Sequence, residues 1–149
     1  MMDSKEAKEA IQALAGELME VRRGMAAKVV YNVSGLYMNL VGTCFIYRDD
    51  LHGEPEGLIL PANLSHQSIH IASFIREHCY VKDAGTWYSM TFTLNPDNSA
   101  DIVLNFDDEP LRFGQSLDPE QYELEMLKFP VVESKRPTWL KSKFKSGSM

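Results

Sequence analysis

The chain has little cysteine and no long apolar run. Its 149 residues include two cysteines, Cys44 and Cys79, which is too few for a small disulfide-stabilised secreted domain. No stretch approaches the ~20 consecutive apolar residues that a membrane helix requires. The N-terminal segment mixes acids and lysines with its apolar residues, unlike a secretory signal. We therefore expect a cytoplasmic protein without membrane association, in which both thiols are reduced and buried.

Basic residues are scarce in the segment that carries the excess of negative charge. The formal net charge is −6, and residues 97–127 contain nine acidic side chains but a single basic one, Arg112. A protein that neutralises phosphates needs clustered Lys and Arg, so direct binding of nucleic acid is not expected. Residues 128–149 have the opposite bias, with six basic side chains and one acidic. The excess negative charge is therefore concentrated in one block.

The common catalytic motifs are also missing. The sequence contains no G-x-S-x-G nucleophile elbow and no glycine-rich phosphate loop before a helix. His78 and Cys79 are adjacent, but neighbouring helical side chains diverge by about 100° and do not pair. We expect no catalytic residue and no cofactor.

One set of residues offers an alternative metal site. If Ser65 caps the second predicted helix, His66, His70 and Glu77 project within about 40° of one another, at positions i, i+4 and i+11. That face is opposite the apolar one, and zinc sites normally need a sheltering second layer of residues. Solvated histidines are the simpler interpretation. A metal-dependent hydrolase using these three residues, or the acids of residues 107–109, remains the alternative function.

The hydrophobic pattern predicts an α+β fold. Apolar residues at three- and four-residue spacing predict a helix over 4–22, which Gly24 should end. The other predicted helices cover about 65–81, with Ser65 as N-cap, and 118–129, with Asp118 and Gln121 forming a capping box. Alternating residues predict strands within 28–48 and over 87–94 and 100–106, and a short strand over 57–60, stopped by Pro61. Asp49–Glu56 reads as an exposed loop.

Two glycines interrupt the first β-rich segment. Gly35 and Gly42 are candidates for a hairpin turn and a bulge, in either order. Because sequential strands are joined by short connections, we predict an antiparallel sheet of four to five strands with two to three helices packed on it. Residues 1–133 form the single predicted domain. Residues 134–149 form a partly ordered basic tail, of which Trp139, Leu140 and Phe144 could dock.

The β-hairpin carries a family resemblance. The segment 85–94, GTWYSMTFTL, and the return segment 101–108, DIVLNFDD, resemble the YezG-like immunity proteins, in which a Trp opens a strand ending in Phe-Thr-Leu. The similarity covers roughly residues 5–130. This chain departs from the family pattern at Asn105, where the family often has Tyr, and at Glu123 and Leu127, where it often has Arg and Trp.

The resemblance implies an immunity protein, or antitoxin, of a bacterial polymorphic toxin system. Such a protein neutralises a cognate secreted toxin, typically a nuclease, by tight binding. An acidic surface suits a nuclease, because a site that holds phosphates is positively charged. The expected contacts are acids supported by apolar anchors: Asp97, Asp101, Asp107, Asp108 and Glu109, with Phe106, Phe113 and Tyr122. The competing interpretations are a merely solvated strand end and a non-catalytic structural or adaptor domain.

Overall fold

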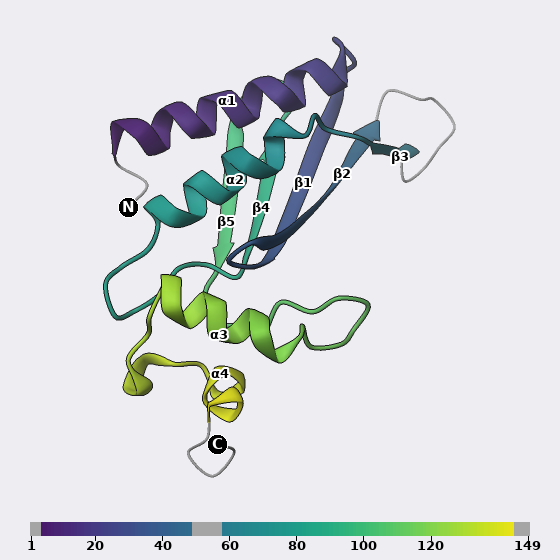
Figure 1. The fold of residues 1–149 in the computed structure, drawn as a ribbon. Helices are drawn as coiled ribbons and strands as arrows, with labels where there is room; N and C mark the ends of the chain where they lie inside the picture. The colour runs from purple at the N-terminus through teal and green to yellow at the C-terminus, as the bar shows by residue number, and fades with distance from the viewer. Residues whose placement is uncertain (1–3, 49–57, 145–149) are drawn as a thin grey trace.

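The computed structural model describes residues 4–48 and 58–144, and it confirms a single-domain α+β fold (Figure 1). Five antiparallel strands form one sheet in the order β3-β2-β1-β4-β5. The predicted loop Asp49–Glu56 lies outside the described residues. In chain order the elements are α1 (Lys5–Arg22), β1 (Ala27–Leu36), β2 (Asn39–Arg48), β3 (Leu58–Ala62), α2 (Gln67–His78), β4 (Ser89–Leu94), β5 (Ala100–Asn105), α3 (Pro119–Lys128), a 3₁₀ turn (Glu133–Lys135) and α4 (Thr138–Lys143).

Helices α1 and α2 cover one face of the sheet, whereas α3 and α4 lie beyond one end of the strands (Figure 1). The first helix begins as predicted, because the Ser4 hydroxyl accepts a hydrogen bond from the Ala7 amide at 3.1 Å. It ends where Arg23 and Gly24 take positive φ angles. None of the helices in the described residues is both long and apolar enough to cross a membrane.

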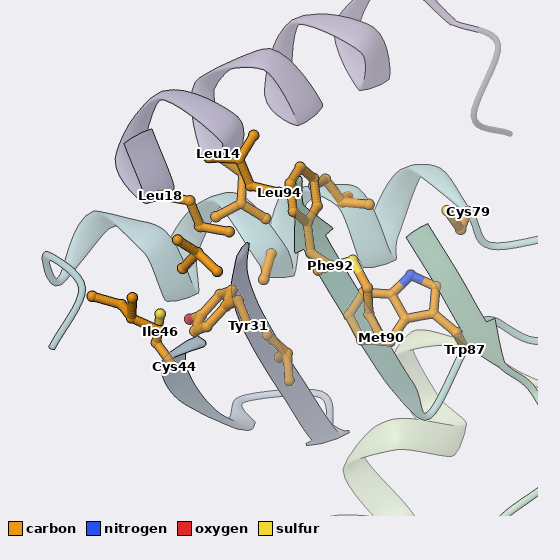
Figure 2. Close-up of a cluster of buried hydrophobic side chains, with 14 of the residues drawn as sticks. Leu14, Leu18, Tyr31, Cys44, Ile46, Cys79, Trp87, Met90, Phe92 and Leu94 are labelled. Atoms are coloured by element: carbon orange, nitrogen blue, oxygen red, sulfur yellow. The ribbon is translucent and has the colours of Figure 1, made fainter. Parts of the chain in front are cut away.

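The main core lies between the sheet and the first two helices. Leu14 and Leu18 of α1 have no exposed surface, and they face Phe92 and Leu94 of β4 (Figure 2). Burying each such side chain contributes about 1.5–3 kcal/mol. The alternate residues of the strands face the opposite side, which no described helix covers. The sheet is therefore a platform with one covered face, as expected for an antiparallel sheet.

The first hairpin turns at neither predicted glycine. Its two central residues are Tyr37 and Met38, between the paired residues Leu36 and Asn39, and Met38 has a φ of 65°. Gly42 instead lies against the ring of Tyr31, where a Cβ would collide with the hydroxyl and the ring. The glycine is needed for a close contact within the sheet rather than for a turn.

Three local predictions fail, two of them because a side chain takes another partner. Ser65 does not cap α2: its hydroxyl donates to a Glu17 carboxylate oxygen, and the position before α2 has no side-chain cap. Gln121 does not complete a capping box, because its carbonyl accepts from the Asn39 side-chain amide at 2.6 Å. Pro61 does not stop β3 but lies within it, which is tolerated because β3 is an edge strand.

A second, smaller core holds α3 and α4 against the end of the sheet. Leu140 of α4 is completely buried, among Leu36, Tyr88 and Tyr122. Trp139 makes an edge-on contact with the Tyr88 ring, with 4.9 Å between centroids. The described part of the basic C-terminal segment is therefore packed on the domain, and Trp139, Leu140 and Phe144 dock as expected.

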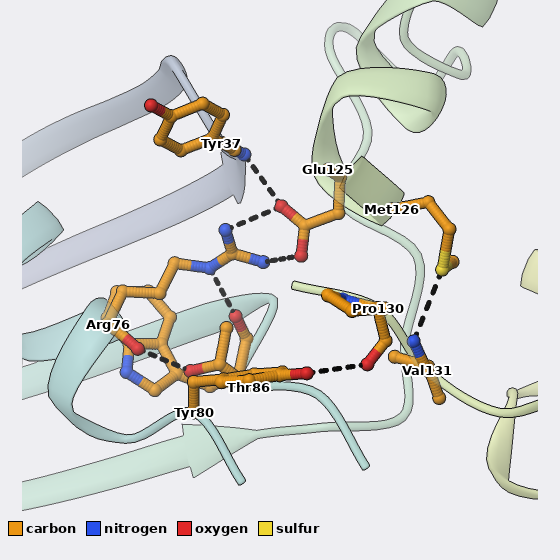
Figure 3. A network of polar contacts seen from close by, with 9 residues as sticks. Tyr37, Arg76, Tyr80, Thr86, Glu125, Met126, Pro130 and Val131 are labelled. Carbon is orange, nitrogen blue, oxygen red and sulfur yellow. Dashed lines mark hydrogen bonds and ion pairs between the residues drawn. The ribbon is translucent and has the colours of Figure 1, made fainter. Parts of the chain in front are cut away.

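A buried ion pair joins α3, which belongs to this second core, to α2 (Figure 3). The Arg76 guanidinium donates to both Glu125 carboxylate oxygens at 2.7 Å, and each side chain is 2% exposed. Arg76 also donates to the Trp87 carbonyl at 2.6 Å, and Glu125 accepts from the Tyr37 amide at 2.7 Å. One acid of the predicted surface block thus serves as an internal link between α2, α3 and two hairpins.

Candidate partner-binding site

The chain leaves β5 through a turn that Asn105 orders. The Asn105 side-chain carbonyl accepts from the amides of Asp107 and Asp108 at 2.8 and 2.9 Å. Its amide group donates to an Asp108 carboxylate oxygen at 2.7 Å. The Trp139 indole N–H donates to the Asp107 carbonyl at 2.6 Å. Both aspartates are exposed, so their charges face solvent on a backbone that is held in place.

Arg112 holds the other end of this loop. Its guanidinium donates to the carbonyls of Ser34 and Asn39, each at 3.0 Å, and those residues flank the β1–β2 turn. Burial lowers the pKa of Arg112, but a guanidinium remains protonated at neutral pH. The single basic residue of the acidic block therefore fixes the loop across the end of the sheet.

Phe113 projects from a tight turn directly after this anchor. Arg112 and Gln115 exchange backbone hydrogen bonds at 2.8 and 3.0 Å, and the two residues between them, Phe113 and Gly114, have φ angles of 54° and 78°. Two positive φ angles are typical of a type I′ turn, which favours Asn-Gly and disfavours a bulky first residue. The Phe113 side chain is nevertheless fully exposed, at 103%. A strained backbone that exposes a large aromatic side chain indicates a functional role.

We call residues 106–116 the end loop. It contains five of the predicted contact residues, of which four are exposed: Phe106, Asp107, Asp108 and Phe113. It adds Leu111, whose side chain is also exposed and which sequence reasoning missed. The structural role of Arg112 was missed as well, although a lone cation within nine acids and the following Phe-Gly pair were visible signals.

Glu109 points inward rather than to the exposed side of the end loop. Its carboxylate accepts from the hydroxyls of Tyr122 at 2.5 Å and Ser116 at 2.7 Å, and Lys143 of α4 lies 3.3 Å away. Burial alone would raise the pKa of Glu109, but these three donors outweigh it and lower the pKa. Tyr122 is itself buried, and its pKa is raised to about 12 by burial and by Glu109. Both residues hold α4 and α3 to the end loop.

We expect Glu109→Gln to weaken the fold in a pH-dependent way. The pKa of Glu109 is lower in the folded than in the unfolded chain, so its contribution is present above the unfolded value and is lost as pH falls through the folded one. The variant should lose on the order of 1 kcal/mol at pH 7. Urea unfolding of both proteins between pH 7 and pH 3 should show the difference shrinking with acid. A constant difference would contradict the ionised network.

Asp97 and Asp101 lie at the other end of the β4–β5 hairpin. Asp97 is in the turn after β4, where the Ser99 hydroxyl and amide donate to its carboxylate at 2.6 and 3.0 Å and lower its pKa. Asp101 accepts from the Asn95 side-chain amide at 2.9 Å. Since a strand rises about 3.3 Å per residue, Asp101 and Asn105 are roughly 13 Å apart along β5, and Asp107 lies beyond Asn105. The exposed acids therefore form two groups rather than one patch.

The alternative metal site does not form. His66 and Glu77 are separated by about 16 Å along the helix axis, because each residue rises 1.5 Å. The rings of His66 and His70 are 5.7 Å apart, and Glu77 instead pairs with Lys128 at 3.5 Å. Among the described residues, no group of three or more His, Cys, Asp and Glu side chains could hold a metal ion.

The two thiols are buried, as expected. Burial raises the pKa of Cys44 to about 11, and burial also raises the pKa of Cys79. A thiol with a raised pKa is a poor nucleophile, because the thiolate is the reactive form. The cysteines therefore belong to the core of the fold.

Comparisons of the sequence with known protein families and with curated proteins find no match.

Proposed function

We propose that this chain is a non-catalytic immunity protein that acts in the cytoplasm and neutralises a basic toxin domain, of the nuclease class, through its end loop. The observation that carries the proposal is Phe113, an aromatic side chain fully exposed on a turn with positive φ, in the same loop as the exposed Asp107 and Asp108. The resemblance of the β4–β5 hairpin to the YezG-like immunity proteins supports the toxin class of the partner.

The end loop combines the two features that a high-affinity protein interface needs. An aromatic anchor that enters a pocket on the partner typically supplies much of the binding energy. Exposed acids around it steer a cationic partner and raise the association rate. The hydrogen bonds of Asn105, Arg112 and Trp139 hold the loop before binding, which reduces the entropy lost on association.

The test is capture of the partner by the wild-type chain and by a variant carrying Asp107→Asn, Asp108→Asn and Phe113→Ala. We expect the wild-type chain to capture a basic protein from its native host and to inhibit that protein's cleavage of DNA or RNA at a one-to-one ratio. The triple variant should fold normally, associate at least tenfold more slowly at low salt and lose most of the inhibition.

A matched control removes the same number of charges elsewhere. Glu9→Gln together with Glu20→Gln neutralises two exposed acids on α1 and should leave capture unchanged. Equal capture by wild type and triple variant would remove the end loop from the mechanism. Capture of a partner with no toxic activity would favour an adaptor domain over an immunity protein.

A further inference from the structure

Among the described residues, the outer edge of β5 has no backbone partner. The strand is the last in the sheet order and pairs with β4 on one side only. Within residues 4–48 and 58–144, no hydrogen bond connects the backbone of residues 100–104 to any element other than β4. Every second residue of an edge strand directs its N–H and C=O groups outward, so β5 presents a template for another strand.

The two edges of the sheet differ in how they are protected. The opposite edge strand, β3, contains Pro61, which prevents regular pairing. In contrast β5, with sequence ADIVLN, contains no Pro, Gly or Lys. Its central Val103 is 64% exposed, and its single charged residue, Asp101, is bound to Asn95. Soluble proteins usually block such an edge, so an unblocked one is a candidate for strand addition.

Negative charges flank this edge at both ends. Asp97 and Asp101 lie at its start, and Asp107 and Asp108 lie just past its end. None of the four forms an ion pair within the described part of the chain, and the segment 97–111 contains no basic residue. The buried Arg22 near the first group already donates to Asn95 and Asn98.

We propose that the β5 edge accepts an extended segment of the partner, about six residues long, with uncharged β-branched residues in the middle and Lys or Arg at both ends. Backbone hydrogen bonds would extend the sheet to six strands, and the cations would meet the two acidic groups. A second copy of this chain fits poorly, because full antiparallel pairing of two β5 strands would bring the acidic group at the start of one strand, with Asp97, toward Asp108 past the end of the other. This inference rests on the proposed function, namely that the partner is a basic protein.

The test uses a synthetic peptide, Lys-Arg-Thr-Val-Thr-Val-Thr-Arg-Lys, titrated into the ¹⁵N-labelled full chain. We expect saturable shifts of the amides of Ala100–Asn105, and weaker or no binding at high salt. A peptide with Glu in place of every Lys and Arg should bind at least about tenfold more weakly. Absence of shifts on β5, or equal binding of the acidic peptide, would overturn the proposal.

Two methylated peptides separate strand pairing from charge attraction alone. One carries N-methyl groups on the odd-numbered central residues and the other on the even-numbered ones, so each loses the N–H groups of one peptide edge. Strand addition predicts that one peptide loses binding and the other keeps it. If both bind like the parent peptide, the contact is electrostatic only and strand addition is wrong.

Two protein variants give a second readout. Val103→Lys places a cation at the centre of the edge and should weaken peptide binding about tenfold. Val41→Lys changes another exposed valine, 45% against 64% exposed, which lies in β2 on the same uncovered sheet face but away from the β5 edge, and should have no effect. Dimerisation of the wild-type chain through β5 in sedimentation experiments would show that the occupant is a second copy and would overturn the proposal.

The outcomes for the edge and for the immunity function are distinguishable. If Val103→Lys leaves capture of a toxin intact while the end-loop variant abolishes it, strand addition fails and the proposed function stands. If the peptide pairs with β5 but no basic toxin is captured, the edge binds a cationic segment of some other protein, and the immunity function fails.

Discussion

Glu125→Leu is expected to destabilise the fold by about 3–5 kcal/mol, because it leaves a buried guanidinium without its counter-ion. Arg76 is 2% exposed and cannot shed its proton, since an arginine guanidinium is not deprotonated in proteins. Its remaining described acceptor would be the Trp87 carbonyl. The Tyr37 amide would also lose its bond to Glu125. Urea unfolding followed by tryptophan fluorescence measures the loss.

Two further variants show whether the charge causes this loss. Glu123→Leu changes an exposed acid of the same helix and should alter the free energy of unfolding by no more than about 0.5 kcal/mol. Adding Arg76→Met to Glu125→Leu removes the unpaired cation, so the double variant should be more stable than Glu125→Leu alone. A loss below about 1 kcal/mol for Glu125→Leu would mean that the guanidinium reaches water.

The parts of the fold that depend on local pattern were predictable from the sequence. The apolar spacing of α1 and the capping hydroxyl of Ser4 act within a few residues of each other, so the helix bounds follow from the sequence. The β4–β5 hairpin follows in the same way from alternation around a polar turn. These signals together gave the antiparallel sheet and the α+β class.

The two failed capping predictions involve side chains that two interactions compete for. Ser65 and Gln121 are good capping residues, yet Glu17 and Asn39 bind them from distant parts of the chain. The Arg76–Glu125 pair spans 49 residues, and nothing in the local sequence marks either partner. Tertiary contacts of this kind override local preference and need coordinates to be seen.

The segment of the chain that contains the candidate site was predictable from the sequence, but the side chains that are exposed together were not. The acidic block was visible in the sequence, but a hairpin carries its residues to opposite ends. Asp97 and Asp107 are therefore far apart in space, although only ten positions separate them in the sequence. Burial also removed Glu109 and Tyr122 from the exposed set, because a polar network links them to Lys143. The exposed part is the end loop, and its geometry depends on where Arg112 binds.

Phe113→Asn is expected to stabilise the free protein and to weaken partner binding strongly. Asn is the preferred residue at the first central position of a type I′ turn before Gly, and Phe at a φ of 54° is strained. Relief of this strain should raise the free energy of unfolding by about 1 kcal/mol. Loss of an aromatic anchor should weaken binding of the captured partner at least about 30-fold. Urea unfolding and a binding titration measure the two effects.

Leu111→Asn is the matched control, because Leu111 is an exposed apolar residue of the same loop without a positive φ. It should give no stability gain. If Phe113→Asn raises stability while weakening binding, and Leu111→Asn does not raise stability, then the chain keeps a strained residue because its partner binds it. Such a loss of stability is a common cost of function. A Phe113→Asn protein that gains no stability would show that the turn is unstrained. One that still binds the partner tightly would show that the anchor is elsewhere, and the acids of the end loop would then act only by steering.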